Sequence, residues 1–183
     1  PRQEKPIPCY SVHPIHELRQ YFQWSKEHGV KPELECFDTG VFDAIRIIRE
    51  GVFWTDDDVM EEEPGLLDDP LWLTFFFGWP GQSCQPMTDI SMFNQIYHLP
   101  DNANWSMSAM SRCPMTYWAQ INRGILQNGH VRVGFEDCGK HPDGTYAQTN
   151  AELVDRAVQM AKSVGRPIAT AEEARETIGL RKM

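Results

Sequence analysis

The sequence predicts an α/β fold with a parallel sheet, and three observations support this prediction. Strand-like and helix-like segments alternate along the 183 residues. Four strand-like segments are each followed by a helix-like one, as parallel pairing with right-handed crossovers requires. One of them, LWLTFFFG at 71–78, is a nearly continuous apolar run, which is typical of a strand buried on both faces.

The expected strands are four, at 32–37, 71–78, 104–110 and 130–135. The expected helices have apolar residues at helical spacing or recognisable ends, at 16–29, 40–51, 88–99, 114–129, 150–165 and 170–179. Gly29 and Gly51 can end the first two helices, and Gly129 and Gly165 can end two later ones.

Helix starts carry signals of their own. Thr88 and Asn150 are expected N-caps, because their side chains can accept a hydrogen bond from a free backbone N–H. Pro114 stands at the start of its helix, where no backbone donor is lost. Thr170 with Glu173 three residues later forms a capping-box pattern.

The acidic segment 54–70 interrupts this order. It is rich in carboxylates and broken by proline and glycine, so we expect a solvated excursion between a helix and a strand. A cation-binding loop is the alternative, but the carboxylate and glycine spacing of an EF-hand is absent.

Composition excludes some classes of protein. The net charge of −9 argues against a nucleic-acid or anionic-membrane partner, and no apolar run is long enough for a membrane span. Five cysteines without a CxxC pair favour a reducing, cytoplasmic location over a disulfide framework. The first ten residues contain no apolar signal region and start abruptly, so processing or truncation is expected.

Two architectures remain open for the single domain 1–183. One is a small open doubly wound sheet. The other is part of a (β/α)8 TIM barrel, which normally needs about 250 residues. The chain supplies about four βα units plus terminal helices. Half of a barrel would expose two sheet edges and would need a complement.

In both architectures ligands bind at the carboxyl ends of the parallel strands. The polar or glycine residues expected there are Glu35, Asp38, Gly78, Gly81, Ser106, Ser108, Arg112, Glu136 and Asp137. Period 2 would place Arg132, Gly134 and Glu136 on one face of the last strand. A buried arginine–carboxylate pair that fixes strand register would explain this arrangement. A carboxylate that binds a metal or polarises a substrate, beside an arginine that holds an anion, is the functional interpretation.

Five stretches resemble, in order, the β-keto acid cleavage enzyme family, whose best-known type is the 3-keto-5-aminohexanoate cleavage enzyme. They are KPELECFDTG, the G-x-P-G turn after the apolar strand, WSMSAMSR, GHVRVGFED and TNAELVDRAVQMAKSVGRPIATAEEAR. The resemblance runs from about Gly29 to Leu180 and implies the C-terminal half of a (β/α)8 barrel. It implies a transferase reaction in which a β-keto acid and acetyl-CoA give acetoacetate and a new CoA thioester.

The resemblance also assigns roles to residues. It implies that Glu136 is a ligand of a divalent metal, typically zinc, and that Arg132 and Asp137 are the proton-abstracting pair. Glu35 corresponds to a further active-site carboxylate, and Arg112 to a contact with substrate or CoA phosphates. Ser106, Gly78 and Gly81 are the remaining expected substrate or CoA contacts.

The sequence departs from the family pattern in two places. The His-x-His pair that completes the metal site is absent, and His13 with His16 precedes a helix instead of following a strand. We therefore expect a missing N-terminal barrel half, on the same or a separate chain, to carry that pair. Cys138 stands where the family usually has asparagine. We expect its thiol to be buried and inert, although a cysteine there could also serve as a soft metal ligand.

Three functions are weighed on this basis. The first is the cleavage enzyme, as a homo-oligomer. The second is a non-catalytic half-barrel that acts as an oligomerisation or interaction module, which an Arg132–Glu136 pair buried without a cavity would favour. The third is an unrelated metal-dependent aldolase or hydrolase of the barrel class.

Overall fold

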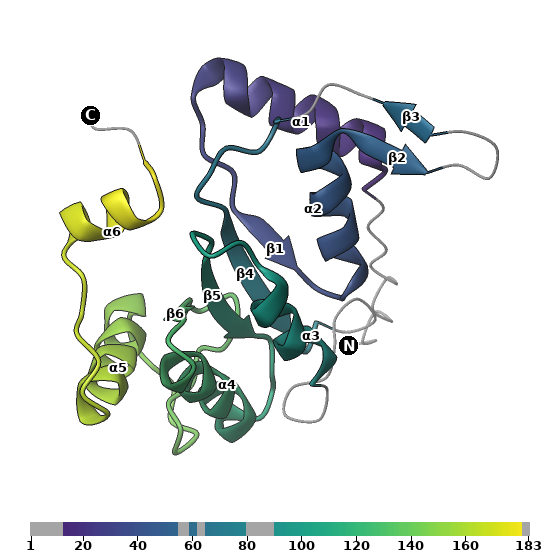
Figure 1. The fold of residues 1–183 in the computed structure, drawn as a ribbon. Coiled ribbons are helices and arrows are strands. Elements are labelled where there is room, and N and C mark those ends of the chain that lie inside the picture. The colour runs from purple at the N-terminus through teal and green to yellow at the C-terminus, as the bar shows by residue number, and fades with distance from the viewer. Residues whose placement is uncertain (1–12, 55–58, 62–64, 80–89, 181–183) are drawn as a thin grey trace.

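A parallel sheet of four strands forms the centre of the molecule (Figure 1). The computed structural model describes residues 13–54, 59–61, 65–79 and 90–180. Within them the strand order is β1 (Leu34–Cys36), β4 (Trp72–Phe77), β5 (Asn104–Ala109) and β6 (His130–Val131). Each neighbouring pair is parallel, so the predicted α/β fold with a parallel sheet is confirmed.

Helices follow these strands as the sequence predicts. Their bounds are α1 (Ile15–His28), α2 (Gly40–Glu50), α3 (Ser91–Asn94), the 3-10 helix η1 (Gln95–His98), α4 (Pro114–Leu126), α5 (Asn150–Ser163) and α6 (Ala171–Thr177). In the view of Figure 1, α2, α3 and α4 lie in front of the sheet, whereas α5 and α6 lie beyond the β6 edge. The strands are added in sequence order without a switch point. Right-handed crossovers then place the helices on one face, as in one part of a barrel and unlike a doubly wound sheet.

The hydrophobic core lies between that face and the helices. Its strand residues alternate in sequence and include Leu34, Cys36, Leu73, Phe75, Phe77, Trp105, Met107 and Ala109. Its helix residues include Ile45, Ile48, Phe93, Tyr117, Trp118, Ile121, Leu153 and Ala157. Strand residues with the opposite parity point to the other face. They include the polar Thr74, Ser106 and Ser108 and the apolar Phe76. One face is therefore packed by helices and the other presents polar groups.

Several predicted helix ends are confirmed. Gly29 ends α1 and Gly51 ends α2, both in the left-handed conformation with φ of 65° and 70°, which glycine adopts without steric cost. Thr170 and Glu173 form the capping box at the start of α6. These signals involve residues three or four positions apart, so they can be read directly from the sequence.

Two predicted helix ends are wrong by a residue or more. The N-cap of α5 is Thr149, whose side chain accepts from the Glu152 N–H, and not Asn150. Asn150 instead accepts a hydrogen bond from the backbone of Phe135 at 3.0 Å. Helix α4 ends at Leu126, and Asn128, with φ of 65°, takes the left-handed position that Gly129 was expected to serve.

Two other elements are shorter than predicted. The helix expected at 88–99 is one turn of α-helix, α3, that continues as η1, and Thr88 lies outside the described residues. The strand expected at 130–135 pairs as β6 only over His130–Val131. The chain then leaves the sheet and turns, so the alternation assumed for the residues after 132 does not hold.

The acidic segment 54–70 contains more structure than an exposed excursion. Strands β2 (Val52–Trp54) and β3 (Val59–Glu61) pair antiparallel, and the chain after them enters the core through Leu66 and Leu67, which are 6% and 5% exposed. The prediction of a solvated segment rested on the many carboxylates. The burial of two adjacent leucines nevertheless places this part of the segment in the core.

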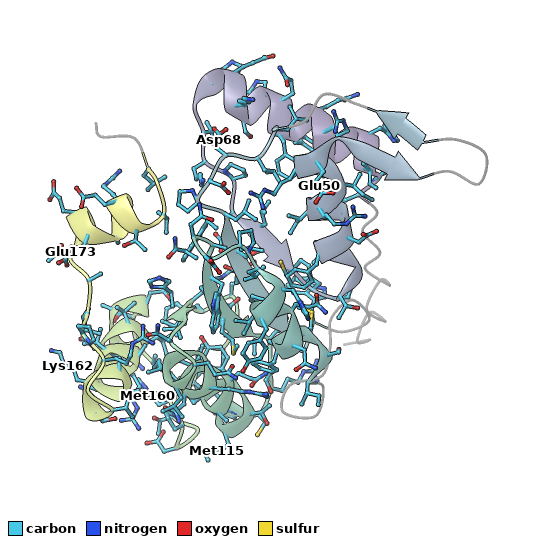
Figure 2. The ribbon with its side chains drawn as sticks, in the orientation of Figure 1. Glu50, Asp68, Met115, Met160, Lys162 and Glu173 are labelled. Carbon is cyan, nitrogen blue, oxygen red and sulfur yellow. The ribbon has the colours of Figure 1, made fainter. Side chains whose placement is uncertain are left out.

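The outer surface is charged. Glu50, Asp68, Lys162 and Glu173, which are labelled in Figure 2, are all exposed. Within the described ranges, no helix combines the length and apolar character needed to cross a lipid bilayer.

Candidate active site

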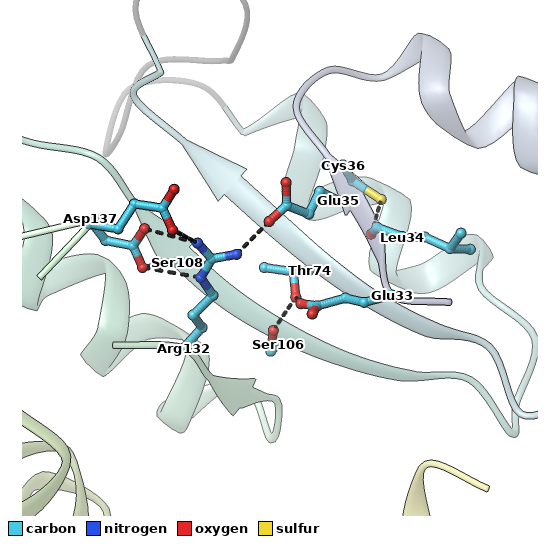
Figure 3. Close-up of polar contacts among 10 residues, drawn as sticks. Glu33, Leu34, Glu35, Cys36, Thr74, Ser106, Ser108, Arg132 and Asp137 are labelled. Carbon is cyan, nitrogen blue, oxygen red and sulfur yellow. Dashed lines mark hydrogen bonds and ion pairs between the residues drawn. The ribbon is translucent and has the colours of Figure 1, made fainter. Parts of the chain in front are cut away.

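Arg132 joins three carboxylates at the carboxyl end of the sheet (Figure 3). Its Nη1 donates to Glu35 in β1. Its Nη2 donates to Glu136 at 2.8 Å, and its Nε donates to Asp137 at 3.2 Å. The guanidinium also lies 5.3 Å from the centre of the Phe76 ring. The structure thus brings together Arg132, Glu136, Asp137 and Glu35.

Backbone hydrogen bonds explain how this cluster forms. The N–H of Arg132 donates to the carbonyl of Met107 at 3.1 Å and extends the β5–β6 ladder by one bond. The carbonyl of Gly134 then accepts from the N–H groups of Asp137 and Cys138 at 3.1 and 3.0 Å. This turn, and not an extended strand, carries Glu136 and Asp137 back to the arginine.

The three carboxylates differ greatly in exposure. The side chain of Asp137 is 1% exposed, that of Glu35 is 38% exposed and that of Glu136 is 70% exposed, while Arg132 is 28% exposed. The three charged residues of 132–137 therefore do not all face inward, because Glu136 is largely exposed. Because one cation faces three carboxylates, the cluster as a whole is negatively charged.

Burial and hydrogen bonding act in opposite directions on Asp137. Burial raises the pKa of its carboxyl, while the charge of Arg132 and the hydrogen bonds from Ser108 and Arg132 limit that rise. Burial by itself would lower the pKa of Arg132, but the carboxylates of Asp137 and Glu35 outweigh it and raise that pKa. The pair is thus a charged arginine holding a carboxylate that accepts a proton more readily than an exposed aspartate.

A second polar network lies beside the first on the same face of the sheet (Figure 3). Thr74 donates to Glu33, and its hydroxyl lies 2.6 Å from that of Ser106. Since the proton of Thr74 goes to Glu33, Ser106 donates to Thr74. Ser106 is 2% exposed, so its hydroxyl is engaged within the protein. Glu33 and Thr74 were not anticipated, although Glu33 and Glu35 share a strand face by period 2.

The other residues expected at the site lie near its rim or outside the described chain. Gly78 follows β4 in the left-handed conformation, with φ of 80°. Arg112 is exposed in the turn between β5 and α4, and among the described residues it does not take part in either of the two polar networks. Gly81 lies outside the described residues. A Cβ at Gly134 would meet only the Asn150 side chain within 4 Å, at 3.8 Å.

The described residues do not fit a zinc site by themselves. Within those ranges no group of three or more His, Cys, Asp or Glu side chains could hold a metal ion. Glu136 offers one exposed carboxylate, whereas zinc sites use at least three protein ligands. His13 precedes α1 and His16 lies in its first turn, and Cys138 is buried with its thiol directed to the Lys140 carbonyl.

Comparison with known proteins identifies relatives of this chain. A family model described as beta-keto acid cleavage enzyme matches residues 9–180. The 3-keto-5-aminohexanoate cleavage enzyme of Acetoanaerobium sticklandii is 36% identical over 159 residues, which cover 85% of this chain and 50% of that protein.

Two further relatives carry transferase names. The 3-dehydrocarnitine:acetyl-CoA trimethylamine transferase of Rhizobium meliloti is 34% identical and covers 90% of this chain and 49% of its own length. The 3-oxoadipate:acetyl-CoA acetyltransferase of Cupriavidus necator is 27% identical, with 86% and 50% covered. The chain thus spans about half the length of the curated relatives it matches.

Proposed function

This chain belongs to the beta-keto acid cleavage enzyme family, and from that premise we propose that it forms part of an acetyl-CoA-dependent enzyme that cleaves a β-keto acid. The names of its relatives support this substrate class. They contain a 3-keto, a 3-dehydro and a 3-oxo compound, and two of the three contain acetyl-CoA.

The carboxylate of Asp137 is the proposed base. It would take a proton from the carbon between the keto and carboxyl groups of the substrate, which is the acidic position of a β-keto acid. Arg132 holds this carboxylate through Nε at 3.2 Å and keeps it oriented. Glu35, on the far side of the guanidinium, keeps Arg132 in place and lowers the net positive charge near the base.

The proposed reaction balances without an external oxidant or reductant. The enolate carbon attacks the acetyl carbonyl of acetyl-CoA and expels the CoA thiolate. The thiolate then attacks the original keto carbon, and the carbon–carbon bond beside it breaks. Asp137 returns its proton to the departing carbon, so the products are acetoacetate and a new CoA thioester.

One observation carries this proposal: a carboxylate with 1% side-chain exposure is held by an arginine at the carboxyl end of a parallel sheet. The non-catalytic alternative would be favoured by an Arg132–Glu136 pair buried without a cavity. Glu136 is 70% exposed, so that condition is not met.

We further propose that the sheet is completed by an N-terminal half, on the same or another chain, into a (β/α)8 barrel. The half-length match to relatives and a sheet whose helices pack on one face support this. In the complete protein Glu136 would supply one metal ligand, and the other ligands would come from the complementary half. No step above depends on that metal.

Other expectations stay proposals of the same kind. Arg112 is a candidate contact for CoA phosphates because it is exposed near the strand ends. Gly78 and Gly81 remain predicted substrate contacts. Ser106 was predicted with them, but its hydroxyl is buried and bonded to Thr74, so it would have to be released before it could contact a substrate. Free thiols at Cys36, Cys113 and Cys138 support a reducing, cytoplasmic location. We also expect a homo-oligomer, and light scattering of the purified protein would measure its molar mass.

The test uses this chain together with its complementary half. The protein is incubated with acetyl-CoA and a panel of β-keto acids, and acetoacetate and the new CoA thioester are measured by mass spectrometry. Asp137→Asn should lower kcat by about 10²-fold or more. Asp155→Asn, on the exposed face of α5, is the matched control and should leave kcat unchanged.

Two results would count against the proposal. One is the absence of acetoacetate with every β-keto acid tried, although the protein is folded and complete. The other is an Asp137→Asn variant as active as the Asp155→Asn control, which would remove Asp137 from the chemistry.

A further inference from the structure

Asp137 does not belong to a strand, although it is the buried carboxylate of the site. It lies in the turn after β6 that the Gly134 carbonyl closes. A turn residue gains little orientation from sheet pairing, so its side chain needs other contacts to hold one geometry. Among the described residues, the side chains that hydrogen-bond to its carboxylate are those of Arg132 and Ser108.

Ser108 offers a rigid support for that carboxylate. It lies in β5, which pairs with β4 on one side and β6 on the other, and its side chain is fully buried, with 0% exposure. Its hydroxyl donates to Asp137 Oδ2 at 2.9 Å. A buried serine in an inner strand has few other positions open to its hydroxyl, so this bond ties a turn residue to the centre of the sheet (Figure 3).

The two oxygens of Asp137 are held unequally. Oδ2 accepts from Ser108 at 2.9 Å and from Arg132 Nε at 3.2 Å. Oδ1 accepts from Arg132 Nη2 at 3.3 Å. Two donors on Oδ2 occupy its lone pairs, whereas Oδ1 keeps one free. The oxygen with the spare lone pair is the one that can receive a proton from a substrate.

We infer that Ser108 is a positioning residue, which acts by holding Asp137 Oδ2 so that Oδ1 is presented to the substrate. Arg132 by itself cannot impose this choice, because its Nε and Nη2 bond both oxygens and the guanidinium is partly exposed. The kinetic consequence rests on the proposed function, while the orientation of the carboxylate does not.

Kinetics of the complete protein test this role. Ser108→Ala removes the hydroxyl and should lower kcat by about 10- to 100-fold, since misplacement of a reacting group by about 1 Å can cost that much. KM should change little, because the Ser108 hydroxyl is bonded to Asp137 and is proposed to act through that carboxylate. Ser108→Thr keeps the hydroxyl and should recover most of kcat. Ser163→Ala, whose hydroxyl bonds within the end of α5, is the matched serine control.

Thermal unfolding of each variant separates a positioning role from a loss of fold. A kcat that stays at the wild-type level in Ser108→Ala overturns the inference. So does an equal loss in Ser108→Ala and in a Ser108→Thr variant that unfolds at the wild-type temperature.

A crystal structure of Ser108→Ala gives a readout that does not depend on activity. The expected result is an Asp137 carboxylate that has rotated or become disordered while β5 and β6 keep their pairing. An unchanged carboxylate overturns the inference. If the wild-type protein cleaves no β-keto acid, the proposed function fails, and this crystal structure still decides the role of Ser108.

Discussion

The three carboxylates around Arg132 should contribute very unequally to stability, and this can be measured. The perturbations are Arg132→Met, Asp137→Asn, Glu35→Gln and Glu136→Gln, combined into three double-mutant cycles. Methionine keeps much of the aliphatic length of arginine, and the amides keep the shape of the acids. Each cycle therefore reports mainly the coupling between the guanidinium and one carboxylate.

Burial sets the expected magnitudes. Asp137 is 1% exposed and Arg132 is 28% exposed, so removing the arginine leaves a buried carboxylate with Ser108 as its remaining donor. Breaking a buried pair costs about 3–5 kcal/mol, and the partial exposure of Arg132 favours about 2–3 kcal/mol for this coupling. The Glu136 pair, with a carboxylate 70% exposed, should couple by less than about 1 kcal/mol. Glu35, at 38%, should fall between these two values.

Urea unfolding at pH 7, followed by circular dichroism, provides the free energies of unfolding for each cycle. Added salt should weaken the Glu136 coupling most, because exposed charges are screened more than buried ones. The reasoning is refuted if Glu136 couples to Arg132 as strongly as Asp137 does, or if the three couplings are equal within error. Either result would mean that exposure does not control these interactions.

Three further predictions address the core, the pH response and the metal. Gly129→Ala should destabilise the fold by about 2 kcal/mol or more, because the new Cβ would lie 2.2 Å from the Trp105 indole. Gly134→Ala is the control and should be tolerated, because its Cβ would meet nothing closer than 3.8 Å. Equal urea midpoints for the two variants would contradict this prediction. Burial, and then the charge of Arg166, lowers the pKa of His130 from its usual 6.5. The free energy of unfolding should therefore be fully retained above about pH 6.5 and fall as the pH drops below it, and His130→Gln should flatten this dependence in urea titrations between pH 7.5 and 5. Finally, this chain purified alone should retain no stoichiometric zinc after dialysis, since Glu136 is a single ligand; one tightly bound zinc per chain by elemental analysis would show that the ligand assignment is wrong.

The sequence predicted much of the fold because its signals are local. Apolar periodicity located the four strands and most helices, and the Thr170–Glu173 capping box was read directly from its spacing. Errors arose where local signals compete. Thr149 and Asn150 are both good N-caps, and the chain uses Thr149 for α5 and Asn150 to hold the turn at Phe135. Such a choice depends on which backbone donor lies nearby.

The candidate site shows the same division. Arg132, Glu136 and Asp137 are neighbours in sequence, and their motif was sufficient to select them. The exposure of their side chains could not be predicted from the sequence, because a turn closed by the Gly134 carbonyl buries Asp137 and exposes the adjacent Glu136. Burial of one residue and not the next depends on the path of the backbone, which period 2 misassigned here.

Contacts between strands were decided by tertiary structure alone. Glu35 lies 97 residues from Arg132, and Ser108 lies 29 residues from Asp137. They meet because the order β1-β4-β5-β6 aligns the carboxyl ends of the strands at one edge. The chain sequence by itself thus determined which residue types occupy the strand ends, and packing of the strands determined which of them touch. The physical reason is that hydrogen-bond partners across a sheet are set by strand order and register, which no short stretch of sequence encodes.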